Sequence, residues 1–213
     1  TGIREFAPDL IICVSTSGRI NNDYRSRSEV LSLEGDVKPD MASLTLSSLN
    51  FNKKASINEP DTIIALAQEM ADKGIKPELE IFDLGMANYA NYLLDKGILK
   101  PPLYANVILG NIACAQPDLL HIGCLIRDLP DGTIISLGGV GRAQLAVNSL
   151  AVSIGYGVRI GLEDNLWYDK NRTKLASNMG LLERIHNIAV ANGREFMAPA
   201  ELRDLLNLSK SLI

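Results

Sequence analysis

The sequence predicts an α/β protein built on a parallel β-sheet, and two observations support this. Short apolar or β-branched runs alternate with longer helical patterns along the whole chain, and no linker or charge run divides it. Such alternation is typical of parallel strands, because each crossover needs a helix-length connection. An open doubly wound sheet and a barrel both fit the pattern. In either architecture the site is expected at the carboxyl ends of the strands.

Six segments are predicted as strands because they are apolar or nearly so, as expected for strands covered on both faces. They are residues 9–17, 41–46, 78–82, 103–109, 133–137 and 157–160. Helices are predicted between them from start and stop residues: a proline suits the first turn, and a glycine suits the left-handed C-terminal cap. These helices cover residues 60–73, closed by Gly74; 86–96, closed by Gly97; a segment from Pro117; 142–154; 175–192; and a segment from Pro199.

The composition and charge of the chain argue against nucleic-acid binding and membrane binding. The chain has 213 residues, 46% of them hydrophobic, and a formal net charge of −4, as expected for one globular domain that binds neither nucleic acid nor a membrane. No apolar stretch reaches the roughly 20 residues that span a bilayer. The three scattered cysteines predict no disulfide framework and a reducing, cytoplasmic location. The first nine residues show no signal peptide and begin as if inside an element, which predicts an incomplete N-terminus.

The segment RIGLEDN, at residues 159–165, carries the densest set of polar residues at a strand end. On an extended backbone the adjacent Glu163 and Asp164 face opposite ways. One of them is then placed to bind a metal while the other acts as a base near Arg159. The alternative is a helix N-terminus, where acids are favoured and Asn165 serves as a cap.

Two glutamates lie inside the third predicted strand. Glu78 and Glu80 alternate with apolar residues, and carboxylates in such a strand need partners or water. If both point into a barrel, they approach basic or metal groups there. The alternative is a structural ion pair.

The turn GGVGR ends the fifth predicted strand. Gly139, Gly141 and Arg142 suit a phosphate site, since glycines let backbone N–H groups approach an anion at a helix N-terminus. The pattern does not match GxGxxG, so a plain tight turn is the alternative. His121 and His186 lie in predicted helices, where structural or surface roles are expected, and a serine triad has no support.

Five segments together resemble the β-keto acid cleavage enzymes, typified by 3-keto-5-aminohexanoate cleavage enzyme. They are PDMASLTLSSLNF (39–51), ELEIFDLG (78–85), GGVGRAQL (138–145), VRIGLEDN (158–165) and the tail at 176–208. The resemblance implies a (β/α)8 TIM barrel, of which residues 1–213 form a single, N-terminally incomplete domain with strands three to eight. It also implies a homo-oligomer, a zinc cofactor, and a retro-Claisen type reaction in which a β-keto acid and acetyl-CoA give acetoacetate and a new acyl-CoA.

The resemblance also implies roles for individual residues. Glu163 matches the carboxylate ligand of the metal, and Asp164 matches an acid/base group assisted by Arg159. The residues that match substrate-contacting positions are Glu80, Ser43 and one serine of the STSG turn, either Ser15 or Ser17.

One departure from the family is clear. The family's other zinc ligands form an H-x-H motif on the second barrel strand, and this chain has no H-x-H. One carboxylate does not hold a catalytic zinc, which typically takes three protein ligands. The chain is therefore expected to be a fragment, or a shortened barrel without activity that serves as a binding or assembly protein. A phosphate-binding barrel aldolase or isomerase that uses Gly139–Arg142 is a further alternative.

Overall fold

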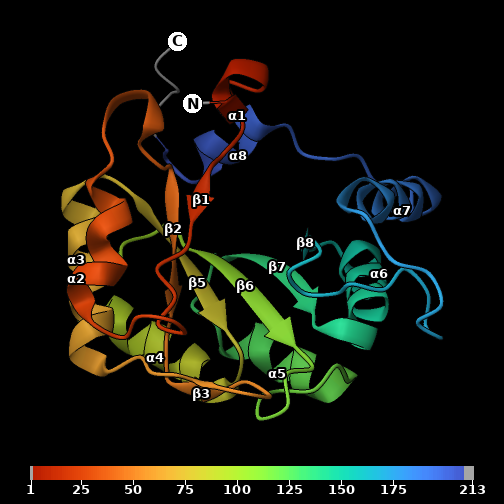
Figure 1. Cartoon of the computed structure of the whole chain (residues 1–213), viewed down its shortest axis with the longest axis horizontal. Coiled ribbons are helices and arrows are strands. Elements are labelled where there is room, and N and C mark those ends of the chain that lie inside the picture. Colours follow the sequence, from red (N-terminus) through yellow and green to blue (C-terminus); the bar gives the residue numbers. More distant parts are fainter. Residues whose placement is uncertain (1, 209–213) are drawn as a thin grey trace.

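A computed structural model describes residues 2–208, and it shows one curved sheet of six parallel strands (Figure 1). The strands are β1 (Cys13–Val14), β2 (Met41–Thr45), β5 (Lys76–Ile81), β6 (Tyr104–Leu109), β7 (Ile134–Gly139) and β8 (Gly157–Arg159), and they pair in this order. β1 and β8 are the two edges of the sheet. This arrangement is most of a (β/α)8 barrel, as predicted.

Helices cover the outside of the sheet. They are α2 (Tyr24–Ser28), α3 (Pro60–Asp72), α4 (Leu84–Asp95), α5 (Leu119–Asp128), α6 (Gln144–Ile154) and α7 (Asn178–Ala191). The predicted stops at Gly74 and Gly97 are correct, since both residues have positive φ. The predicted starts of α4, α5 and α7 were misplaced, because Asp83, Asp118 and Ser177 accept backbone N–H bonds as helix caps and fix the first residues of these helices.

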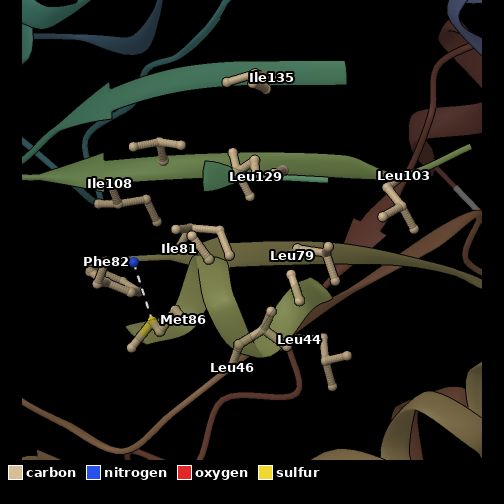
Figure 2. Close-up of a cluster of buried hydrophobic side chains, with 14 of the residues drawn as sticks. Leu44, Leu46, Leu79, Ile81, Phe82, Met86, Leu103, Ile108, Leu129 and Ile135 are labelled. Atoms are coloured by element: carbon tan, nitrogen blue, oxygen red, sulfur yellow. Dashed lines mark hydrogen bonds between the residues drawn. The ribbon is translucent and has the colours of Figure 1, made fainter. Parts of the chain in front are cut away.

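The outward faces of the strands supply the core. Leu44, Leu79 and Ile81 are fully buried and belong to one apolar cluster with residues of α3, α4 and α5. Figure 2 shows part of this cluster, including Met86 of α4, whose sulfur accepts a hydrogen bond from the backbone N–H of Phe82. Burying side chains of this size contributes about 1.5–3 kcal/mol each.

The inward face of the sheet is polar instead. Side chains alternate along a strand, so each strand sends one set outward and the other inward. Register aligns Thr45, Glu80, Asn106 and Ser136 in one row across β2, β5, β6 and β7, with Gly157 of β8 at its end. This row contains Glu80, which the sequence placed inside the third strand, and it lines the candidate site.

The edge strand β1 is much shorter than its predicted span of residues 9–17. On either side of β1, backbone N–H groups donate to side chains instead of to the backbone of β2. Ile12 N donates to Asp40 Oδ2 at 2.8 Å, and Thr16 N donates to Ser43 Oγ at 3.1 Å. The residues of β1 that pair with β2 are therefore limited to Cys13 and Val14.

Asp40 also joins the two ends of the described chain at the amino-terminal side of the sheet. Arg4 of α1 (Gly2–Phe6) lies 3.0 Å from Asp40 Oδ2, and Arg203 of α8 (Pro199–Leu205) lies 2.8 Å from Oδ1. These ion pairs hold α1 and α8 next to each other (Figure 1).

The prediction omitted α1, α2 and the hairpin of β3 (Leu49–Asn50) and β4 (Ala55–Ser56). Among residues 2–208, no helix has the length and apolar character needed to cross a membrane.

Candidate active site

The side chain of Arg159 is the centre of the polar interior. Its Nε donates to Asp164 Oδ2 at 3.0 Å, and its Nη2 donates to Glu163 Oε2 at 3.2 Å. Its Nη1 lies 3.6 Å from Glu80 Oε1 and 3.9 Å from Glu78 Oε1. Four carboxylates, two from β5 and two from the turn after β8, therefore converge on one guanidinium, which explains why the glutamates of β5 are tolerated.

The surrounding carboxylates stabilise the charge of Arg159. Burial alone would lower the pKa of Arg159, but Asp164 and Glu80 raise it above its ordinary value. The guanidinium is therefore a permanent cation. It holds the Asp164 carboxylate, only 11% exposed, in a fixed orientation.

Glu80 differs from the other acids in its surroundings. Burial raises its pKa, although the Thr45 hydroxyl donates to its Oε2 at 2.6 Å and Arg159 lies nearby, both of which act in the opposite direction. Glu80 thus holds a proton to higher pH than a solvated glutamate does.

Glu78 lies one layer deeper in the interior. It accepts hydrogen bonds from Asn106 Nδ2 and from the thiol of Cys13, the latter at 3.1 Å. Asn106 is 4% exposed, and its Oδ1 has no partner among the described residues. Beside it, Tyr104 and Ser136 share a hydrogen bond of 2.8 Å.

Two glycines make room for these side chains. A Cβ on Gly138 would lie 3.1 Å from Arg159 Cβ, and a Cβ on Gly157 would collide with Ser136 Oγ. Larger residues on β7 and β8 would therefore displace the arginine or the serine.

The EDN segment is a turn, and this corrects both sequence-based expectations for it. Residues 161–164 form a bend and turn in which Asp164 N donates to Gly161 O, so neither an extended strand nor a helix N-terminus is present. The turn lets Glu163 and Asp164 both reach Arg159. Asn165 does not cap a helix; its side chain contacts the backbone of Trp167.

Glu163 lies at the open mouth of this cluster, with its side chain 62% exposed. It also contacts Arg19 from the loop after β1, at 3.1 Å, and Arg19 stacks over the ring of Phe51. Arg19 and Glu163 thus connect the loops that follow the two edge strands.

The three serines differ in position. Ser43 is 6% exposed, and its hydroxyl accepts from Thr16 N. Ser15 is exposed and accepts from Ser17 N, while Ser17 accepts from Arg19 N and Nε. Both loop serines stay candidates for substrate contact.

The GGVGR turn has a packing reason for its glycines. A Cβ on Gly139 would lie 2.7 Å from the backbone of Ala143, and Gly141 has a φ of +58°. The N–H of Gly141 already donates to Asp164 O, whereas Arg142 is exposed. The phosphate site stays a prediction.

His121 and His186 lie outside the cluster, on α5 and α7. Nδ1 of His121 accepts from Gln116 N, and His186 stacks on Phe196. Sequence reasoning gave no role to Cys13, Tyr104 and Ser136. The signal that could have found them is polar residues with a period of two, seen at Ser43 and Thr45 and again at Tyr104 and Asn106.

The described residues do not fit the zinc that the family resemblance implies. Among residues 2–208, no group of three or more His, Cys, Asp or Glu side chains is arranged to hold a metal. Glu163 is paired with two arginines, and the other carboxylates surround Arg159. A zinc ion at Glu163 would need donors other than these.

Fold and site together define a barrel enzyme with a carboxylate-rich centre, and comparisons with known proteins identify its family. Residues 1–208 match the beta-keto acid cleavage enzyme family, and the chain belongs to that family. It is 34% identical to the 3-keto-5-aminohexanoate cleavage enzyme of Fusobacterium nucleatum, over 98% of this chain and 74% of the relative. It is 36% identical to the 3-oxoadipate:acetyl-CoA acetyltransferase of Cupriavidus necator, over 97% of this chain and 72% of the relative.

The fold also matches a solved structure, that of apo ObcA. The TM-score is 0.77 at 20% identity, with 97% of this chain covered. The chain spans about half the length of that protein (52%).

Proposed function

We propose that the protein cleaves a β-keto acid in a reaction with acetyl-CoA, giving acetoacetate and a new acyl-CoA. The observation that carries the proposal is the convergence of Asp164, Glu163 and Glu80 on Arg159 at the strand ends of a chain from this family. Relatives named for 3-keto-5-aminohexanoate and 3-oxoadipate support the substrate class, and the second name supports acetyl-CoA as the co-substrate.

The reaction balances without an oxidant or a reductant. The bond between C2 and C3 of the keto acid breaks, and C2 forms a bond to the carbonyl carbon of the acetyl group. The bond between the acetyl carbon and the CoA sulfur breaks, and the freed CoA thiolate takes the acyl group whose carbonyl carbon is C3. The proton removed from C2 returns to C2 when the bond between C2 and C3 breaks. The step that needs a base is removal of a proton from C2, which lies between two carbonyl groups.

Asp164 is the proposed base. Its second carboxylate oxygen is free of the Arg159 hydrogen bond, and the guanidinium fixes the orientation of the group. Arg159 also supplies positive charge where oxyanions form. Glu80 and Ser43, with Ser15 or Ser17, are the proposed substrate contacts. No step is assigned to zinc.

The turn at Gly139–Arg142 is proposed to take the phosphates of CoA. Arg142 is exposed there, and no side chain caps the start of α6. The same turn would serve the alternative of a phosphate-binding aldolase or isomerase, but the relative named as an acetyl-CoA acetyltransferase favours CoA.

A homo-oligomer and a cytoplasmic location complete the proposal. Exposed apolar residues on α7, namely Met179, Leu182 and Val190, suit a subunit contact. None of the three cysteines is in a disulfide, which suits a reducing compartment.

The test is acetoacetate formation from a panel of β-keto acids with acetyl-CoA. Consumption of acetyl-CoA with matching acetoacetate and acyl-CoA supports the proposal. A folded protein that forms no acetoacetate with any member of the panel overturns it and favours the non-catalytic barrel.

A further inference from the structure

Arg27 is a buried cation whose contacts bridge two site loops. It lies at the end of α2 and is 4% exposed. Its Nε donates to Thr16 O at 2.8 Å, its Nη1 to Ile57 O at 3.3 Å, and its Nη2 to Asn58 Oδ1 at 2.7 Å. All three acceptors are neutral oxygens. The buried charge of Arg27 is therefore compensated by hydrogen bonds to these oxygens.

Asn58 extends this connection to the loop after β2. Its Nδ2 donates to Ser47 O at 2.9 Å, and its backbone N–H donates to Ser48 Oγ at 2.8 Å. Asn58 is 3% exposed, and its side-chain amide accepts from Arg27 and donates to Ser47.

The loop after β1 is fitted closely against this pair. A Cβ on Gly18 would lie 2.7 Å from Ile57 O and 3.1 Å from Arg27 Nη1. Thr16 also donates its hydroxyl to Ser43 O at 2.6 Å, which ties the same loop to β2. Arg27 therefore holds the turn that carries Ser15 and Ser17 through its hydrogen bond to the carbonyl oxygen of Thr16.

We propose that Arg27, acting on its own and through Asn58, is a positioning residue that clamps the loops after β1 and β2 together so that Ser15 or Ser17 meets the substrate. Arg27 does not itself reach the interior where Arg159 lies. It acts on binding through the backbone of Thr16. The inference rests on the proposed function for its kinetic consequence, but the clamp itself is independent of the reaction.

The planar guanidinium is what the clamp requires. Its three nitrogens reach three acceptors on two separate segments, Thr16 on one and Ile57 with Asn58 on the other, whereas a lysine offers one ammonium group to the same space. Arg27→Lys is therefore expected to keep part of the clamp, and Arg27→Met none of it. Arg25→Met is the matched control, because Arg25 is on the same helix and exposed.

The first measurement is amide hydrogen exchange of the peptides that cover residues 15–19 and 47–51. Arg27→Met is expected to accelerate exchange there by about tenfold or more, as expected when a hydrogen bond to a charged group is lost. Arg27→Lys is expected to be intermediate and Arg25→Met unchanged. If the methionine variant does not fold, Arg27→Lys and Asn58→Ala decide. Unchanged exchange in folded variants overturns the clamp.

The second measurement separates KM from kcat for the best keto acid. Arg27→Met is expected to raise KM about tenfold with kcat changed less than about threefold, the pattern of lost binding. A fall in kcat at constant KM overturns the positioning role. If the wild-type protein converts no keto acid, the proposed function fails, while the exchange result still tests the clamp.

Discussion

Arg159 Nε and Asp164 Oδ2 lie 3.0 Å apart, although the two residues are separated by a turn and belong to the last strand and its following loop. The same guanidinium contacts Glu163, Glu80 and Glu78. One basic residue therefore contacts all four carboxylates, and it fixes the orientation of Asp164, the proposed base.

Asp164→Asn is expected to lower kcat for acetoacetate formation by about 10²- to 10⁴-fold, the usual contribution of a positioned base. The asparagine keeps an oxygen for Arg159 but cannot accept a proton from C2. Asp131→Asn, an exposed acid, serves as the control and should leave kcat unchanged. Full activity of Asp164→Asn would move the base elsewhere in the cluster.

Glu80 predicts a pH dependence of stability. Its pKa in the fold is raised above the ordinary value of 4.5, so the folded protein binds this proton more tightly than the unfolded chain does. The contribution of this proton to the free energy of unfolding is full below the pKa that Glu80 has in the unfolded chain. It is lost as pH rises through the pKa that Glu80 has in the folded protein. Glu80→Gln should therefore gain stability relative to wild type as pH rises above about 4.5.

Urea unfolding of both proteins at a series of pH values checks this. The difference in unfolding free energy between Glu80→Gln and wild type is expected to grow with pH. A difference that stays constant from pH 4 to pH 8 would show that the Glu80 pKa is not raised.

The zinc content of the purified protein tests whether the described residues hold a metal at Glu163. The described residues offer Glu163 but no cluster of three donors, so the 213-residue chain is expected to retain well under one zinc after dialysis. Elemental analysis by mass spectrometry measures this. One zinc per chain in wild type that disappears in Glu163→Gln would contradict the expectation and place a metal at this carboxylate.

The outward face of β5 carries part of the stability. Leu79→Ala is expected to lower the free energy of unfolding by about 2–5 kcal/mol, because Leu79 is fully buried and its removal leaves a cavity. Leu120→Ala, where Leu120 is 74% exposed on α5, should change it by about 0.5 kcal/mol or less. Equal effects in denaturant titrations would mean that the core does not lie where the burial places it.

Much of this fold follows from sequence pattern. Apolar runs at the spacing of βα units located all six strands. Gly74 and Gly97 located two helix ends, because the residue after each helix has a positive φ, which glycine adopts readily. The sequence also located the acids of the RIGLEDN segment. Its turn was missed because a backbone bend over residues 161–164 leaves no periodic signal.

The length of β1 and the clamp around Arg27 were beyond sequence reasoning for a different reason. Both depend on contacts between residues far apart in the chain. The hydroxyl of Ser43 accepts the hydrogen bond from Thr16 N that a strand carbonyl would otherwise accept. The side-chain oxygen of Asn58 accepts a hydrogen bond from Arg27. Local propensity contains no information about such pairs, since tertiary contacts override it.

Gly157 and Ser136 supply the last prediction. They are paired in register on β8 and β7, and a Cβ on residue 157 would collide with the Ser136 hydroxyl. Gly157→Ala should therefore cost about 1–3 kcal/mol of stability by overpacking and disturb the hydrogen bond between Ser136 and Tyr104. Removing the hydroxyl should relieve the collision, so Gly157→Ala combined with Ser136→Gly is expected to recover much of the loss relative to the sum of the single variants. Unfolding titrations of the four proteins measure this coupling. Strict additivity would show that the two residues do not meet in the interior, and would remove the reason for a glycine on β8.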